Sequence, residues 1–247
     1  MVFGSDYSEI YDSLYTEHDY ENDVCNIIKY VTLFNPKATS LADFGCGSGT
    51  HLNLLSRHYH KTVGFDISQP MLNRACTKFP HLHFEHGDVK NHDLNDTFDV
   101  ITMNSAVMCY QLRDDDVMAT MQNVRRHLNS DGLFVFDVWY GPAVLSRGVH
   151  PKVKKYSLIG SEECVRVVEP SLNVKFDACT CLYTWFHNGH KHSESHIVRY
   201  FFYNNINLFL KATGFELLRM CDTITGGSTC DMLDNSPWHV TFVARAI

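Results

Sequence analysis

The sequence of 247 residues lacks the features of a membrane or secreted protein. No apolar run approaches the roughly 18 residues that a membrane span needs. Residues 1–20 are acidic and rich in tyrosine, without a positively charged stretch that leads into an apolar one, so we expect neither a signal peptide nor an anchor. Internal repeats and low-complexity linkers are also lacking. With 45% hydrophobic residues, the sequence predicts a globular protein that buries a full core.

Clustered basic charge and regularly spaced cysteines are missing too. The 21 Lys and Arg are outnumbered by 28 Asp and Glu, for a formal net charge of −7, and they are mostly scattered singly. Because nucleic-acid binding requires clustered basic residues, we expect no nucleic-acid partner. Nine cysteines form an odd number without a repeating spacing, which favours reduced thiols over a disulfide framework. We therefore expect a cytoplasmic protein that has no membrane partner.

Strand-like and helix-like segments alternate up to about residue 138. The strand-like runs lie at 40–44, 61–65, 82–85, 98–103 and 133–138, and the helix-like stretches between them at 50–58, 69–79 and 114–128. This alternation predicts βαβ units and a parallel sheet.

The pattern changes after residue 139. Consecutive strand-like runs at 156–159, 164–168, 174–186 and 195–202 are separated by turn signals such as EPSLN and HNGH, which predicts an antiparallel insert. A helix at about 205–211 and two strands at 215–221 and 239–246 then return to the sheet. We expect three parts, namely an N-terminal helical cap (1–39), a core (40–139 and 203–247) and an antiparallel substrate-binding insert (140–202).

The stretch LADFGCGSGT places three glycines directly after the first strand-like run. Glycine permits a sharp turn at positive φ and a close approach of a ligand to the backbone. Thr50 begins the next helix, whose free N–H groups attract a carboxylate or phosphate. Gly45, Gly47 and Gly49 form G-x-G-x-G rather than the dinucleotide pattern G-x-G-x-x-G, which disfavours NAD.

The next two strands end in acidic residues. Asp66 ends the second strand, where a carboxylate accepts hydrogen bonds from both hydroxyls of a ribose. Asp88 ends the third, where it can accept from an adenine amino group while Val89 covers one face of the ring. Ile67 and Met71 are candidates to cover the other face. Together these residues predict a site for an adenosine-containing ligand.

Several motifs resemble the class I S-adenosylmethionine-dependent methyltransferases. They are DFGCGSGTHL, VGFDISQPML, HGDV and FDVITMNSAVMCY, and the resemblance covers nearly the whole length. Three further stretches, YSEIYDSLY…HDY, LFVFDVWY and SESHIVRYF, are similar to the N,N-dimethyltransferases of nucleotide-linked amino sugars in macrolide biosynthesis. The family's fold implies a Rossmann-like α/β sheet of seven strands, the last one antiparallel, with an antiparallel β insert over the active site.

The resemblance also implies roles for single residues. It places the methionine part of the cofactor against the three glycines, with Tyr20 near its carboxylate and Asn104 near the methionine or sulfonium. The amino-sugar enzymes have a histidine close to the acceptor nitrogen, and the aligned position here is Tyr110. That difference leaves either the base or the substrate open.

Methyl transfer from a sulfonium mainly requires that the nucleophile be aligned with the bond between the methyl carbon and sulfur, be shielded from water, and be unprotonated. Tyr110 and Tyr7 are the catalytic candidates, because a phenol within hydrogen-bond reach can orient the lone pair or relay a proton. A phenol with a pKa near 10 is a poor base at neutral pH, so orientation is the more plausible role for Tyr110.

Further residues are candidates for binding the acceptor. Tyr7, Tyr11 and Tyr15 are four apart, which predicts one aromatic stripe on a helix, either packed in the core or forming a cap over the active site. Trp139 follows the fifth strand, where it lines the acceptor pocket or plugs the end of the sheet. His196 lies on the matched ESH motif and is expected to face the substrate.

The histidine-rich stretch HNGHKHSESH matches no structural zinc spacing, and its Asn-Gly pair predicts a hairpin turn, so we expect no metal.

The resemblance implies a methyltransferase that moves a methyl group from S-adenosyl-L-methionine to a small-molecule amine and releases S-adenosyl-L-homocysteine. The amine of a nucleotide-linked amino sugar is one candidate, although the stretch 225–240 holds no arginine for its diphosphate. O- or carboxyl-methylation of a small metabolite stays open, as does a catalytically silent protein that only binds the cofactor. The expected partner is a small-molecule acceptor, and a homodimer stays open beside a monomer.

Overall fold

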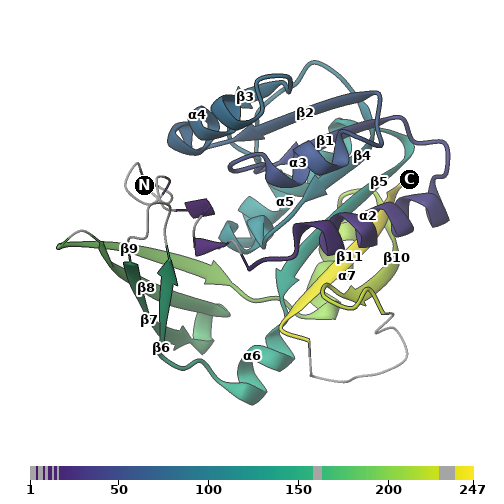
Figure 1. Ribbon diagram of the computed structural model, residues 1–247. Coiled ribbons are helices and arrows are strands. Elements are labelled where there is room, and N and C mark those ends of the chain that lie inside the picture. The colour runs from purple at the N-terminus through teal and green to yellow at the C-terminus, as the bar shows by residue number, and fades with distance from the viewer. Residues whose placement is uncertain are drawn as a thin grey trace.

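The computed structural model describes residues 4, 8, 11–12, 14–15, 17–157, 163–187, 189–227 and 237–247 (Figure 1). Its helices and short 3₁₀ turns are α2 (Tyr20–Phe34), α3 (Thr50–Leu55), α4 (Gln69–Lys78), η1 (Val107–Tyr110), α5 (Asp114–Arg126), α6 (Gly141–Arg147), η2 (Val174–Phe176) and α7 (Tyr203–Ala212). Its strands are β1 (Ser40–Phe44), β2 (Lys61–Asp66), β3 (Phe84–His86), β4 (Phe98–Met103), β5 (Leu128–Trp139), β6 (Lys152–Ser157), β7 (Glu163–Asn173), β8 (Ala178–His187), β9 (His190–Arg199), β10 (Phe215–Asp222) and β11 (His239–Ala246).

Seven strands form one mixed sheet in the order β10-β11-β5-β4-β1-β2-β3. Strands β1 to β5 pair in parallel, and β11 runs antiparallel to both β10 and β5. The strand order reverses between β1 and β4. The connections that follow these two strands therefore leave in opposite directions, which opens a crevice for ligands at the carboxyl ends of the strands. The predicted seven-stranded α/β sheet with an antiparallel last strand is confirmed.

Helices cover both faces of this sheet, because its central strands are apolar on both sides. On one face, α2 and α3 pack on side chains such as Leu41 and Leu133. On the other face, α5 and α7 pack on the alternate residues, including Ala42 and Phe134. The period of two along each strand therefore supplies two cores from one sheet.

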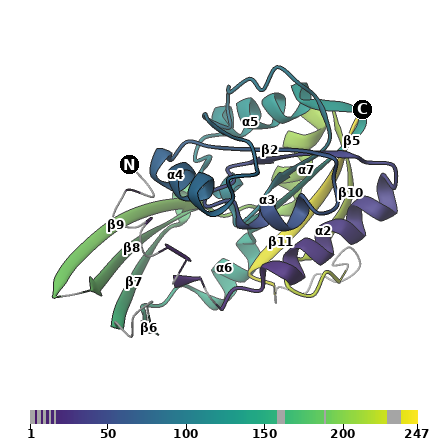
Figure 2. The same cartoon turned by 45° about the horizontal axis from the view of Figure 1, so that its top comes forward.

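The second sheet has four antiparallel strands in the order β6-β7-β8-β9 and stands to one side of the first in both views (Figures 1 and 2). Leu14 packs against Trp185 of this sheet, so the described part of the N-terminal segment contacts it. The predicted antiparallel insert is confirmed, with two local corrections. The stretch EPSLN (169–173), expected as a turn, lies inside β7 and pairs with β8. The strand expected over 174–186 begins only at Ala178, because residues 174–176 form a 3₁₀ turn and Asp177 has a left-handed φ of 49°.

No helix within the described ranges is both long and apolar enough to cross a membrane. The division of the chain into cap, core and insert stays a prediction.

Candidate active site

Two cavities meet at the crevice between β1 and β4. The glycine-loop cavity, about 450 Å³, is lined by the residues that follow β1, β2, β3 and β4. The tyrosine cavity, about 390 Å³, is lined by the N-terminal segment, α2, the ends of β5 and β11, and the second sheet. The residues common to both are Tyr11, Tyr20, Asn104, Ser105 and Tyr110. Two ligands placed in these cavities would therefore meet beside these five side chains.

The glycine turn makes one wall of the glycine-loop cavity. Gly45 and Gly47 have φ values of 81° and 55° and line the cavity with backbone alone. A Cβ added to Gly45 would lie 2.6 Å from a methyl carbon of Val107, so only glycine fits there. Gly49 is not among the lining residues of either cavity. Its missing side chain makes room for the Phe84 ring, because a Cβ added there, at a φ of 78°, would lie 2.8 Å from a ring carbon.

Asp66 joins the glycine turn to the end of β2. Its carboxylate accepts the Gly47 N–H at 2.8 Å and the Ser68 N–H at 2.8 Å. Burial raises the pKa of this carboxyl, while the two backbone N–H groups act in the opposite direction. Two oxygens offer about four acceptor positions, so lone pairs remain for the hydroxyls of a ligand in the cavity.

The residues expected to bind adenine line the same cavity. Asp88, Val89, Ile67 and Met71 all line it. Met71 is buried, whereas Ile67 is 59% exposed, which leaves a large apolar side chain available to cover a flat ring. The structure thus brings together the acids and apolar residues that the sequence placed at separate strand ends.

Replacing Asp66 by Ala is expected to weaken binding of S-adenosylmethionine by about 1.5–3 kcal/mol, which is roughly 10- to 150-fold in Kd, because charge-assisted hydrogen bonds are lost. Titration calorimetry measures the Kd. The control is Asp115→Ala, which removes an 88% exposed carboxylate on α5. Equal affinity of Asp66→Ala and wild type would contradict the ribose role.

Asp43, near the end of β1, was not among the candidate site residues that the sequence predicted. It is buried and lines the glycine-loop cavity. Its carboxylate accepts hydrogen bonds from the Thr102 hydroxyl at 2.7 Å and from the Asn104 amide at 3.1 Å. Burial raises the pKa of Asp43. An aspartate at the end of a buried strand, directly before a glycine turn, was the signal that could have identified it.

Tyr110 lies between the two cavities and is hydrogen-bonded to the insert. Its hydroxyl and the His196 Nδ1 are 2.9 Å apart, which ties η1 to β9. The His196 Nε2 lies 3.3 Å from a Glu194 carboxylate oxygen, and the Tyr183 ring packs on the same imidazole. Burial raises the pKa of the Tyr110 phenol well above its usual range. The hydroxyl therefore stays protonated and acts by hydrogen bonding.

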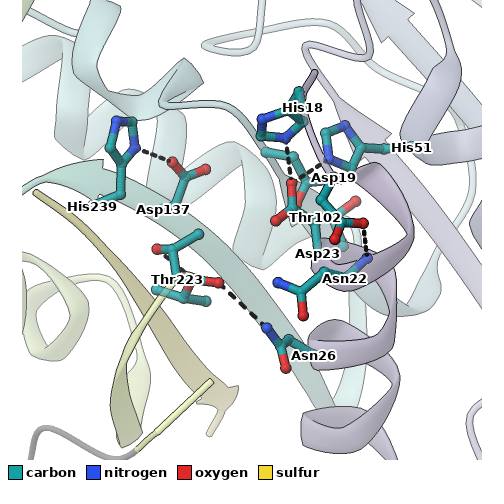
Figure 3. Close-up of polar contacts among 12 residues, drawn as sticks. His18, Asp19, Asn22, Asp23, Asn26, His51, Thr102, Asp137, Thr223 and His239 are labelled. Carbon is teal, nitrogen blue, oxygen red and sulfur yellow. Dashed lines mark hydrogen bonds and ion pairs between the residues drawn. The ribbon is translucent and has the colours of Figure 1, made fainter. Parts of the chain in front are cut away.

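Another histidine that lines the tyrosine cavity, His239, was not identified from the sequence. It begins β11 and contacts Asp137 of β5, with 3.1 Å between Nδ1 and the carboxylate (Figure 3). Trp139, predicted to bind the acceptor, lines the same cavity and packs edge-on against Trp238.

His18 and His51 both point to one carboxylate oxygen of Asp23, at 2.6 and 3.2 Å (Figure 3). Burial alone would raise the pKa of Asp23, but the two imidazoles outweigh it and lower it to about 2. The hydrogen bond to Asp23 raises the pKa of His18 against the effect of burial. The donor atoms of the three residues lie within 4.8 Å of one another, so they could hold a metal ion. These ligand atoms already contact one another, because Asp23 Oδ2 is within hydrogen-bond distance of both imidazoles.

The described structure brings nearly all of the predicted site residues together. The cofactor candidates that line the glycine-loop cavity are Tyr20, Gly45, Gly47, Asp66, Ile67, Met71, Asp88, Val89 and Asn104. Trp139 and His196 line the tyrosine cavity, and Tyr11 and Tyr110 line both. Tyr7 lies outside the described residues. The Tyr11 and Tyr15 rings pack 4.6 Å apart and both line the tyrosine cavity.

Residues 41–132 match a family model described as a methyltransferase domain. A dTDP-4-amino-2,3,4,6-tetradeoxy-D-glucose N,N-dimethyltransferase from Saccharopolyspora spinosa is 31% identical over 143 residues, which cover 57% of each chain. A dTDP-3-amino-3,4,6-trideoxy-alpha-D-glucopyranose N,N-dimethyltransferase from Streptomyces venezuelae is 27% identical over 149 residues, or 60% of this chain and 63% of that protein. The matches thus span less than two thirds of these relatives' own length.

Solved structures agree over the whole length. An S-adenosylmethionine-dependent methyltransferase from Clostridium acetobutylicum has a TM-score of 0.82 at 22% identity, with 98% of both chains covered. A sugar N-methyltransferase from Streptoalloteichus has a TM-score of 0.82 at 21% identity, with 100% of this chain and 94% of that chain covered. The resemblance carried by the motifs is confirmed: the chain contains a methyltransferase domain at residues 41–132 and has, throughout, the fold of the class I S-adenosylmethionine-dependent methyltransferases.

Proposed function

We propose that the protein transfers a methyl group from S-adenosylmethionine to the amine of a small molecule. One observation carries the proposal. The glycine-loop cavity and the tyrosine cavity meet at Asn104, Ser105 and Tyr110, so a donor in the first and an acceptor in the second would touch there.

The residues of the glycine-loop cavity suit the cofactor. Gly45 and Gly47 line this cavity without side chains, so the methionine part could approach their backbone closely. Asp66 and Asp88 would accept from ribose and adenine, and the carboxylate of Asp43 favours the positive charges of the cofactor's ammonium and sulfonium. When bound, the cofactor supplies an activated methyl group, so the chain has to position the acceptor and exclude water.

The tyrosine cavity suits an amine better than a carboxylate acceptor. Its described lining includes the carboxylates of Asp23 and Asp137 and the rings of several tyrosines, without any lysine or arginine. Carboxylates and aromatic faces attract an ammonium ion and repel an anion. The relatives act on nucleotide-linked amino sugars, so we propose that an amino-sugar ring enters this cavity. Any diphosphate would then lie outside the lining described here.

Tyr110 would orient the acceptor in this arrangement. Its protonated hydroxyl is held by His196 at the boundary of the two cavities. Tyr11 and Trp139 would contact the acceptor ring on its other sides.

A transfer assay with methyl-labelled S-adenosylmethionine tests the proposal. We expect labelled product with free and nucleotide-linked amino sugars, and at least about tenfold less with their hydroxyl analogues, because a neutral hydroxyl is a weaker nucleophile than a neutral amine. Cofactor binding in calorimetry without transfer to any amine would instead support a silent binding protein.

We propose that the protein acts in the cytoplasm. The eight cysteines in the described ranges are all free thiols, which suits a reducing compartment.

A further inference from the structure

His239 begins β11 at the wall of the tyrosine cavity. In the antiparallel pair of β11 and β5 it lies opposite Trp139, two residues beyond Asp137. Its Nδ1 lies 3.1 Å from the Asp137 Oδ2, and the two side chains face each other (Figure 3). A carboxylate only accepts hydrogen bonds, so Nδ1 carries the proton. In the neutral ring the other nitrogen, Nε2, is then the basic one.

Asp137 is itself held firmly. Its side chain is 8% exposed, and both of its oxygens accept the Ala106 N–H, each at 3.0 Å. The carboxylate therefore cannot rotate without losing these bonds. This arrangement resembles a base that is oriented by a third group, since the backbone fixes the acid and the acid fixes the imidazole.

The turn that Asp137 holds is strained. Ser105 and Ala106 have φ values of 59° and 60°, which residues other than glycine rarely adopt. Such a backbone conformation costs about 1–3 kcal/mol per residue, and it persists where the surrounding structure holds it, often at active sites. Both residues line the tyrosine cavity, and Ser105 also lines the glycine-loop cavity. Asp137 thus connects His239 to the boundary where donor and acceptor would meet.

Solvent access distinguishes His239 from His196, whereas His18, which also lines this cavity, already contacts the Asp23 carboxylate through its Nε2. The His196 side chain is 3% exposed and hydrogen-bonded to Tyr110, whereas the His239 side chain is 35% exposed. A group that takes a proton in each cycle has to return it to water. His239 is open enough to do so, and the buried pair is not.

We propose that His239 is the proton acceptor of the methyl transfer and that Asp137 is its positioning residue. The inference rests on the proposed function. The acceptor ammonium gives one proton to Nε2 of His239, and the freed lone pair forms a bond to the methyl carbon. The bond from that carbon to sulfur breaks, its electron pair stays on the sulfur of S-adenosylhomocysteine, and the imidazolium releases the proton to solvent.

Kinetics of His239→Gln test this role. Glutamine keeps a similar size but accepts no proton, so we expect kcat to fall about 100-fold, the scale of general base catalysis, while the Kd for S-adenosylmethionine changes less than about twofold. Added imidazole should raise the kcat of His239→Ala at least about fivefold over its value without imidazole. Asp137→Asn should also lower kcat. The matched control is His58→Gln, because His58 is exposed and lines neither cavity.

A readout without turnover tests the orientation. Nitrogen NMR of histidine-labelled protein should show Nδ1 of His239 protonated and Nε2 unprotonated, and Asp137→Asn should abolish this preference. Thermal melting confirms that each variant is folded.

His239→Gln with kcat within about threefold of wild type, or a rise in KM alone, would overturn the role of His239 and leave the proposed function standing. A wild-type protein that binds the cofactor but methylates no amine would overturn the proposed function and, with it, this role.

Discussion

Gly45→Ala is expected to abolish measurable methyl transfer and to lower the melting temperature by about 6–12 °C. A left-handed φ of 81° costs an alanine about 1–2 kcal/mol. The added Cβ would also lie 2.6 and 2.8 Å from the two methyl carbons of Val107, so the turn or η1 must move. A total near 3 kcal/mol corresponds to about 2–4 °C for each kcal/mol in a chain of this size. Since both segments line the glycine-loop cavity, the shift removes cofactor binding as well.

A second substitution separates the contact from the backbone strain. Val107→Ala in the Gly45→Ala background removes the two methyl carbons and leaves only the Cβ at 3.3 Å. We expect this pair to regain about half of the lost stability in thermal melting and part of the cofactor affinity in calorimetry. Gly4→Ala is the control, because no atom lies within 4 Å of its added Cβ and its φ is not positive. Wild-type affinity in Gly45→Ala alone would show that the turn tolerates a side chain.

Asp43→Ala is expected to lose about 3–5 kcal/mol of stability together with activity. The substitution leaves the Thr102 hydroxyl and the Asn104 amide without their acceptor in a buried site, at about 1–3 kcal/mol each. Asn104 lines both cavities, so its release is also expected to disorder the boundary between the two cavities. Urea unfolding measures the stability. Asp96→Ala, which removes an exposed carboxylate, is the control.

The conservative substitution Asp43→Asn tests the charge through its pH dependence. Burial raises the pKa of Asp43, so the native carboxyl holds its proton at a pH where the unfolded one has lost it. The free energy of unfolding therefore falls as the pH rises from about 3.9 through the native pKa, and this part of the fall is absent in Asp43→Asn. Parallel urea titrations from acid to neutral pH measure the difference. Identical curves for the two proteins would show that Asp43 is not the source.

The sequence predicted much of the cofactor side because the relevant signals are local. Gly45 and Gly47 lie in one turn, and Asp66 and Asp88 each end a strand-like run. The carboxyl ends of neighbouring parallel strands lie at the same edge of the sheet, so recognising the strands was enough to place these residues together.

The tyrosine cavity depends on pairings that no local pattern specifies. His239 and Asp137 are 102 residues apart, and they meet because β11 inserts antiparallel beside β5. Tyr110 and His196 are 86 residues apart and meet because the second sheet reaches η1. The sequence named Tyr110 and His196 as separate candidates, and their hydrogen bond appeared only in the structure.

By itself, then, the sequence determined the alternating strands and helices, the glycine turn and the acids at the strand ends, because each follows from backbone conformation and hydrophobic period over a few residues. Only the tertiary structure decided that Asp43 is a buried acceptor of hydrogen bonds, that Asp137 holds a strained turn, and that His239 lines the tyrosine cavity. These depend on burial and on distances between segments remote in the chain, which become defined only when the whole sheet is assembled.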